Sequence, residues 1–211
     1  MDLKQDLLKA LGELRKDENA TRKFNQTVDL IINLQKFDVK KSNINLFLGI
    51  PHKIKEKKVG GFLEIQSKDV ETIAPSEFKN YSDKKDIKKL ANRFDFFIAQ
   101  ANLMPKVATV FGRALGPAGK MPSPQLGILM NADEKSIKAL KDKIDANVKI
   151  KVKESSVKLA IGKQNMKDEQ ISDNVLAVYN ALLKVLPKEK DNIKNVEIKF
   201  TMTKPQKIQI R

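Results

Sequence analysis

Two kinds of strand pattern divide this chain and limit what it can fold into. Near both ends, apolar residues alternate with polar ones, as in residues 28–34 and 196–202. Such alternation indicates strands that bury one face and expose the other. In the middle, residues 96–99 are apolar without a break, which is typical of a strand covered on both faces. The ends and the middle are therefore expected to belong to different sheets.

Helical patterns accompany both kinds of strand. Leucines at helical spacing indicate a helix over residues 3–14, and residues 168–186 carry the strongest helical pattern, which Pro187 ends. In the middle, residues 87–94 and 137–144 have helical spacing. Further strands are expected at residues 44–50, 59–65, 148–152, 157–161 and 208–210.

One architecture accommodates these patterns. Residues 1–64 and 148–211 form a discontinuous α+β domain, in which helices pack on an antiparallel sheet. Residues 65–147 form an inserted α/β domain of the three-layer, Rossmann-like kind. The hinge between them lies near residues 64–66 and 147–149.

The charge of the chain points to a polyanionic partner. Lys and Arg number 41 against 26 Asp and Glu, a formal net charge of +15. A field of this sign attracts polyanions in a salt-dependent way. Charge alone leaves rRNA, mRNA, DNA and an anionic membrane open as partners, and also a basic protein with no such partner.

Several classes of protein are disfavoured by what the chain lacks. It has no cysteine and one histidine, His52, so disulfides and multi-histidine metal sites are excluded. No apolar run is long enough to span a bilayer, and residues 1–5 do not read as a signal peptide. We expect a cytoplasmic protein that is not an enzyme, has no cofactor or metal, and is a monomer when free.

A glycine-rich segment, Gly112 to Lys120, is the one feature that favours an enzyme. A phosphate-binding loop needs a glycine five residues before the Gly-Lys pair, and Ala114 stands there. Met121 follows Lys120, where a hydroxyl would bind magnesium. We interpret residues 112–124 as a long loop with a rigid basic turn that carries Arg113 and Lys120. A nucleotide-dependent enzyme stays the alternative function, beside a general nucleic-acid binder.

Four motifs carry a resemblance to a known family. Residues 103–124 read LMPKVATVFGRALGPAGKMPSP, and residues 22–29 read RKFNQTVD. Ile-Pro-His at residues 50–52 and FTMTKPQ at residues 200–206 complete the set. In this order and over the whole chain, they resemble the universal L1p family of large-subunit ribosomal proteins, those of the mobile stalk. The Lys-Pro-Gln segment is closer to the archaeal and eukaryotic branch.

The resemblance implies a function and its partners. It implies a structural constituent of the large ribosomal subunit, with the two-domain fold above, that binds stalk rRNA through the terminal-half domain. It further implies a role in the release of deacylated tRNA from the exit site, and repression of translation by binding its own mRNA.

The resemblance also transfers RNA-binding residues onto this sequence. It places Lys23, Phe24 and Thr27 on one wall of the site, and Thr201, Met202 and Thr203 on the other. Further transfers are Gly162, Lys163 and Asn195. In such a site lysine neutralises phosphate, threonine bonds 2′-hydroxyls, and Phe24 and Met202 pack on riboses or bases.

Two of these residues have open alternatives. Taken without the family, Phe24 is as well explained as a residue of the hydrophobic core. Thr203 stands where the family has a glycine, a residue that permits close RNA approach or a positive φ.

Overall fold

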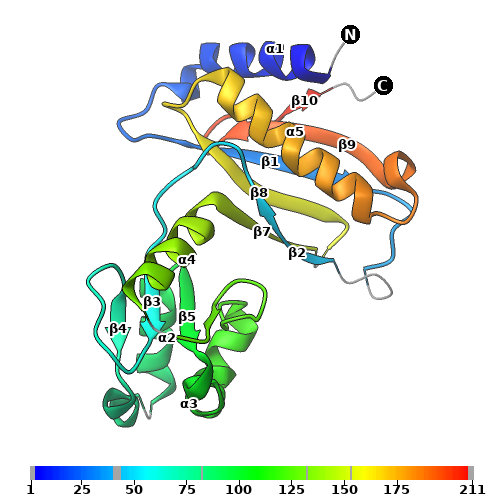
Figure 1. Ribbon diagram of the computed structural model, residues 1–211. Coiled ribbons are helices and arrows are strands. Elements are labelled where there is room, and N and C mark those ends of the chain that lie inside the picture. The colour runs from blue at the N-terminus through cyan, green and yellow to red at the C-terminus, as the bar shows by residue number, and fades with distance from the viewer. Residues whose placement is uncertain (1–2, 40–43, 82, 132, 153, 209–211) are drawn as a thin grey trace. The chain divides into compact units, whose positions relative to one another are not determined.

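The computed structural model describes residues 3–39, 44–81, 83–131, 133–152 and 154–208, and Figure 1 shows their helices and strands. Contacts between Cα atoms group the chain into two compact units, Met1–Ile54 with Ala146–Arg211, and Lys55–Asp145. These limits differ from the predicted ones at residues 64 and 148. The main cause is the strand at residues 59–62, which pairs with strands of the second unit.

The first unit is built on an antiparallel sheet of four strands in the order β10-β9-β1-β8. Along the central strand, each buried residue alternates with a half-exposed one, so one face lies in the core and the other is open. The expected antiparallel sheet is confirmed. Its strands are β1 (Thr27–Leu34), β8 (Ser156–Lys163), β9 (Ile193–Phe200) and β10 (Gln206–Ile208).

Two helices cover the buried face of this sheet. They are α1 (Leu3–Lys16) and α5 (Asp168–Val185), which lie across the same side of the sheet in Figure 1. Leu7 and Leu11 of α1 and Val178 of α5 are fully buried in the core. Short 3-10 turns, η1 (Glu18–Ala20) and η4 (Glu189–Asn192), lead out of the two helices.

A two-stranded antiparallel ribbon completes the first unit. It consists of β2 (Asn45–Gly49) and β7 (Asn147–Lys151). Leu46, Leu48 and Val148 are partly buried and pack against the same core as the larger sheet. The ribbon therefore belongs to the first unit although its two strands flank the second one in sequence.

The second unit contains a parallel sheet in the order β4-β3-β5-β6. Phe97 and Ile98, neighbours on β5, are both fully buried, which confirms the reading of the unbroken apolar run. The strands are β3 (Val59–Phe62), β4 (Glu71–Ile73), β5 (Phe96–Gln100) and β6 (Ile128–Leu129).

An aromatic cluster joins the helices of the second unit to its sheet. The Phe111 ring of α3 lies 4.9 Å from that of Phe62 on β3 and 5.2 Å from that of Phe78, between ring centroids. The helical elements are η2 (Pro75–Asn80), α2 (Lys84–Arg93), η3 (Ala101–Leu103), α3 (Met104–Ala118) and α4 (Glu134–Ala146).

The prediction of a long loop over residues 112–124 was wrong, because α3 continues to Ala118. Val107, Phe111 and Leu115 recur every four residues and are fully buried, so burial of this stripe outweighs the low helix propensity of the glycines between them. The helix ends at Gly119, whose φ of 69° is left-handed. Only the residues after Gly119 connect to β6.

Two smaller differences concern strand ends. The last long strand stops at Phe200 rather than at residue 202, and residues 201–203 form a turn. The predicted strand over residues 208–210 is β10 at Gln206–Ile208, and residues 209 and 210 lie outside the described part of the chain. No helix in the described ranges is both long and apolar enough to cross a bilayer.

Candidate nucleic-acid interface

The two walls of the predicted site meet at one end of the antiparallel sheet, where β1 begins and β8 and β9 end. Thr27 pairs with Lys163 across β1 and β8, while Val28 pairs with Phe200 across β1 and β9. The Thr27 N–H donates to Thr201 Oγ1 at 3.1 Å, and the Thr201 N–H donates to the Thr27 carbonyl at 3.1 Å. We call Phe24, Thr27, Thr201 and Met202 the tip cluster.

Gln26 is fully buried beneath the tip cluster and connects both of its chain segments. Its Oε1 accepts from the Met202 N–H at 2.9 Å, and its Nε2 donates to the carbonyls of Asn19 and Ala20 at 2.9 and 3.0 Å. Its own carbonyl accepts from the Gln164 N–H at 2.9 Å. The sequence reasoning missed this residue, because nothing in a local pattern marks a glutamine as buried.

The Gln26 hydrogen bonds fix the chain segments that carry Phe24 and Met202, and both side chains extend into solvent. Their side chains are 51% and 49% exposed, among the few large apolar side chains of the described residues with that much exposure. The alternative that Phe24 is a core residue is therefore wrong. An exposed aromatic ring and an exposed thioether each offer a face on which a base or ribose packs.

Basic side chains surround the tip cluster. Lys23 and Lys204 are exposed and have no ion-pair partner among the described residues. Lys163 Nζ donates to Thr27 Oγ1 at 2.9 Å, which fixes both side chains at the start of β1. Positive charge thus lies at Thr27, at the residue before Phe24, and two residues after Met202.

Asp29 lies one step further along the open face of the sheet, level with Lys199. Burial raises the pKa of the Asp29 carboxyl above its ordinary value, and the nearby charges of Lys199 and Lys163 offset only part of that rise. The open face next to the tip cluster therefore combines two lysines with one carboxyl that ionises less readily than usual.

Arg15 of α1, a second residue that sequence reasoning missed, braces the loop after β8. Its guanidinium donates to Asp168 at 2.6 Å and to the carbonyls of Gln164 and Met166 at 2.9 Å each. It also lies over the Phe200 ring, 5.9 Å from the centroid. These contacts keep the loop in place beside the tip cluster.

Thr203 supports the turn that carries Met202. Its side chain is buried, its Oγ1 accepts from the Phe200 N–H at 2.9 Å, and its φ is not positive. The residue therefore closes the turn with its hydroxyl, and its side chain does not point to the surface.

Gly162 lies where β8 packs against α5, and the position of its missing side chain faces the core. A Cβ on this residue would lie 3.1 Å from Ile171 Cγ1, so the glycine allows α5 to pack closely on β8. Of Gly162 and its neighbour Lys163, only Lys163 extends a side chain toward Thr27.

Asn195 lies away from the other predicted residues. It pairs with Asn33, at the far end of β1 from Thr27, and six residues of extended strand separate it from Thr201 by about 20 Å. Its Nδ2 donates to Glu197 at 3.1 Å. The structure brings the other predicted side chains to one end of the sheet and leaves Asn195 outside.

The rival site at Gly112–Lys120 has no phosphate cradle. Gly112 and Gly116 lie within α3, Gly119 ends it, and Lys120 Nζ donates to the carbonyls of Ala91 and Phe94 at 2.7 and 2.8 Å. The lysine therefore closes the end of α2 rather than reaching toward a ligand.

His52 has a structural place in the first unit. Its N–H donates to Asn174 Oδ1, and its carbonyl accepts from Asn174 Nδ2, both at 2.9 Å. Its Nε2 lies 3.6 Å from Asp173, a carboxylate whose pKa hydrogen bonding from Lys4 lowers. In the ranges that the structure describes, no three His, Cys, Asp or Glu side chains gather as metal ligands would.

Comparison with known proteins adds a family to this geometry. The profile of the ribosomal protein L1p/L10e family matches residues 14–204. The chain is 34% identical over 195 residues to the large ribosomal subunit protein uL1 of Nanoarchaeum equitans, covering 88% of this chain and 92% of the relative. The protein of the same name from Methanobrevibacter smithii is 34% identical over 210 residues, covering 94% and 96%. That of Thermococcus kodakarensis is 32% identical over 217 residues, covering 98% of each.

Proposed function

The chain belongs to the ribosomal protein L1p/L10e family, in its archaeal branch, and on that premise we propose that it is a structural constituent of the large ribosomal subunit that binds stalk rRNA. Its relatives are named as large-subunit proteins. The site for rRNA is the tip cluster of the first unit, with Lys23 and Lys163 beside it. The role is structural, and the chain is not an enzyme.

One observation carries the assignment of the site. Phe24 and Met202 are apolar and about half exposed, yet buried hydrogen bonds hold the segments that carry them. Leaving two large apolar side chains in water is unfavourable, and fixing their backbone does not relieve that cost. A fixed, exposed apolar pair within positive charge is suited to stacking on RNA.

Truncation of either side chain tests the site. Phe24→Ala and Met202→Ala should each weaken binding to a stalk rRNA fragment by about 1–3 kcal/mol, because each removes a packing surface for a base or ribose. Titration at near-physiological salt with an unrelated duplex as competitor measures this, since charge alone binds both RNAs.

Val185→Ala is the matched control, because Val185 is 47% exposed in the same unit but lies on α5 away from the tip cluster. It should leave affinity unchanged. Equal affinity for the stalk fragment and the unrelated duplex would exclude the proposed function.

The same surface supports two further proposals. An mRNA segment that copies the rRNA fold would occupy the tip cluster in place of rRNA and repress translation of that message. Contact with exit-site tRNA would assist release of the deacylated molecule. Competition between the stalk fragment and the chain's own mRNA tests the first, and Phe24→Ala should weaken both complexes alike.

Neither alternative function has comparable support. A nucleotide-dependent enzyme would need the Gly112–Lys120 segment to cradle phosphates, but Gly112 and Gly116 are helical and Lys120 binds carbonyl groups of α2 and the residue after it. A general nucleic-acid binder would need only the net charge of +15, and would not explain the fixed apolar pair.

The proposal also covers the domain organisation. We propose a discontinuous RNA-binding domain formed by the two ends of the chain, and an inserted α/β domain of the three-layer, Rossmann-like kind. The limits at residues 54–55 and 145–146 are the ones to use in experiments, because they keep β3 with its parallel neighbours.

A further inference from the structure

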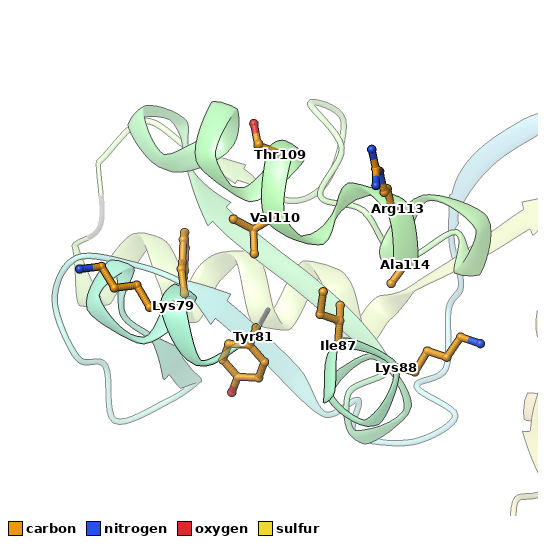
Figure 2. Close-up of a pocket in the computed structure, with 9 residues that line it drawn as sticks. Lys79, Tyr81, Ile87, Lys88, Thr109, Val110, Arg113 and Ala114 are labelled. Atoms are coloured by element: carbon orange, nitrogen blue, oxygen red, sulfur yellow. The ribbon is translucent and has the colours of Figure 1, made fainter. Parts of the chain in front are cut away.

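The second unit carries an open pocket between α2 and α3. Its volume is about 590 Å3. Its apolar wall is formed by Phe78, Tyr81, Ile87, Val110 and Ala114, from η2 and both helices. In Figure 2 the side chains of Val110 and Ile87 extend into the space between α3 and α2, and the Tyr81 ring lies below them with its hydroxyl turned away. We call this the α2–α3 pocket.

Three cations line the α2–α3 pocket. Lys79, Lys88 and Arg113 line it, are exposed, and make no ion pair with any described residue. Basic residues close by are already engaged, since Lys89 pairs with Asp86 at 2.9 Å and Arg93 with Glu71 at 2.7 Å. The positive charge at the rim is therefore available to an anion.

Among the described residues that line the pocket, none carries a carboxylate. Three acids are close enough to raise the pKa of the Tyr81 hydroxyl, after burial as the larger cause, while Arg93 lowers it. Of these, Glu71 and Asp86 are the two acids in the ion pairs above. Glu77 is left as the one acid near the hydroxyl whose charge is not offset by an ion pair in the described residues.

The dimensions favour a small planar group over a helix. The α3 residues that line the pocket run from Thr109 to Ala114, a rise of about 7.5 Å. An amphipathic helix that anchors at positions i and i+7 needs about 10 Å of groove. A volume near 590 Å3 lies within the range of small-ligand sites.

We propose that the α2–α3 pocket binds one unpaired nucleotide of single-stranded RNA, with the base against Tyr81 and Val110 and the phosphates facing Arg113, Lys88 and Lys79. An aromatic ring and an aliphatic wall accept any base, and cations at the rim follow the backbone. The inference does not rest on the tip cluster, because the pocket lies wholly within the second unit.

A charge reversal with a matched control tests the proposal on the full chain. A fluorescent RNA tetranucleotide is titrated against the protein, and the methyl NMR signals of Val110 and Ile87 report on the pocket. Arg113→Glu should lower the affinity about tenfold. Lys106→Glu makes the same change of charge on an exposed residue of α3 outside the pocket, and should lower it less than about threefold.

Two more variants test the lining of the pocket separately from the charge at its rim. Ala114→Leu fills the pocket and leaves its charge intact, so affinity should fall as in Arg113→Glu. Tyr81→Phe keeps the ring that packs 5.5 Å from Phe111, so affinity should stay within about twofold.

Four results would overturn the proposal. They are equal losses from Arg113→Glu and Lys106→Glu, unchanged methyl signals, displacement of the RNA by an acidic peptide at lower concentration than by RNA, and a free mononucleotide that binds as well as the tetranucleotide. None of these bears on the tip cluster, whose test uses stalk rRNA and variants of the first unit.

Discussion

The tip cluster and the α2–α3 pocket combine apolar side chains with cations in opposite shapes. The tip cluster exposes Phe24 and Met202 to solvent, whereas the half-buried Tyr81 and Val110 line the α2–α3 pocket. The first joins segments 174 residues apart, and the second uses residues 78–114 alone. A projecting pair suits the groove or fold of a structured RNA, and a recess suits one displaced nucleotide. The comparison predicts that RNA binding at the tip cluster and RNA binding at the α2–α3 pocket can be lost independently of each other.

Removal of the second unit should have the largest effect on this comparison. With residues 55–145 replaced by a short glycine-serine linker, the remaining chain keeps its own core and the whole tip cluster. Affinity for the stalk fragment should stay within about threefold, while tetranucleotide binding at the pocket is lost. If the isolated 55–145 segment binds the stalk fragment as tightly as the full chain, the tip cluster is not the site.

Gln26→Ala should give the next largest effect, because it leaves the Met202 N–H and two carbonyl groups without their buried partner. We expect a loss of about 1–3 kcal/mol in the free energy of unfolding of the first unit. Hydrogen exchange of the β1 and β9 amides measures it.

Stalk affinity should fall with Gln26→Ala while tetranucleotide binding does not. Gln125→Ala, an exposed glutamine of the second unit, is the control and should change neither. Unaltered exchange of the Met202 amide in Gln26→Ala would show that the two segments are held together by other contacts.

Asp29→Asn should give the smallest effect. Because the pKa of Asp29 is raised in the folded chain, the native state holds this proton more tightly than the unfolded chain does. The stabilisation is complete below the ordinary value near 3.8 and is lost as the pH rises through the raised pKa. At neutral pH the ionised carboxylate therefore costs stability, and Asp29→Asn should raise it by less than about 1 kcal/mol.

Thermal unfolding at neutral and acidic pH measures the change, which should vanish below the ordinary pKa of the carboxyl. Asp142→Asn removes the same charge from an exposed position in the second unit and is the control for the loss of one negative charge. A lower Tm for Asp29→Asn at neutral pH would mean that attraction to Lys163 and Lys199 outweighs burial.

Local periodicity predicted the helices and strands in which apolar residues at regular spacing form one buried stripe. The alternation in β1 and the helical spacing in α5 match the observed bounds within two residues, since each stripe is buried against one core. In α3 the same kind of stripe is present at Val107, Phe111 and Leu115, but the glycines and Pro117 of this segment favour a loop when the sequence is read alone. Helix propensity is a weak prior where a fully buried stripe competes with it.

The candidate site depended on long-range pairing, which no local pattern contains. Phe24, Thr27, Thr201 and Met202 came from the family resemblance, and the pairing of β1 with β9 brings them together. Gln26 and Arg15 could not be predicted, because each acts through carbonyl and amide groups of segments distant in sequence or on other elements. Asn195 was transferred by its spacing from Thr201, and spacing along one strand places it at the other end of the sheet.

The hydrogen bond between Gln26 and the Met202 amide also sets an order of events during synthesis. Residues 19–34 leave the translating ribosome early. The Met202 amide that bonds Gln26, and strand β9 that pairs with β1, emerge only after residue 202 has been added. A nascent chain that stops before residue 202 lacks one side of the tip cluster, and Gln26 Oε1 has no Met202 N–H to accept from. On the proposed function, affinity of the tip cluster for stalk rRNA thus appears in one late step, and prematurely terminated products lack this site.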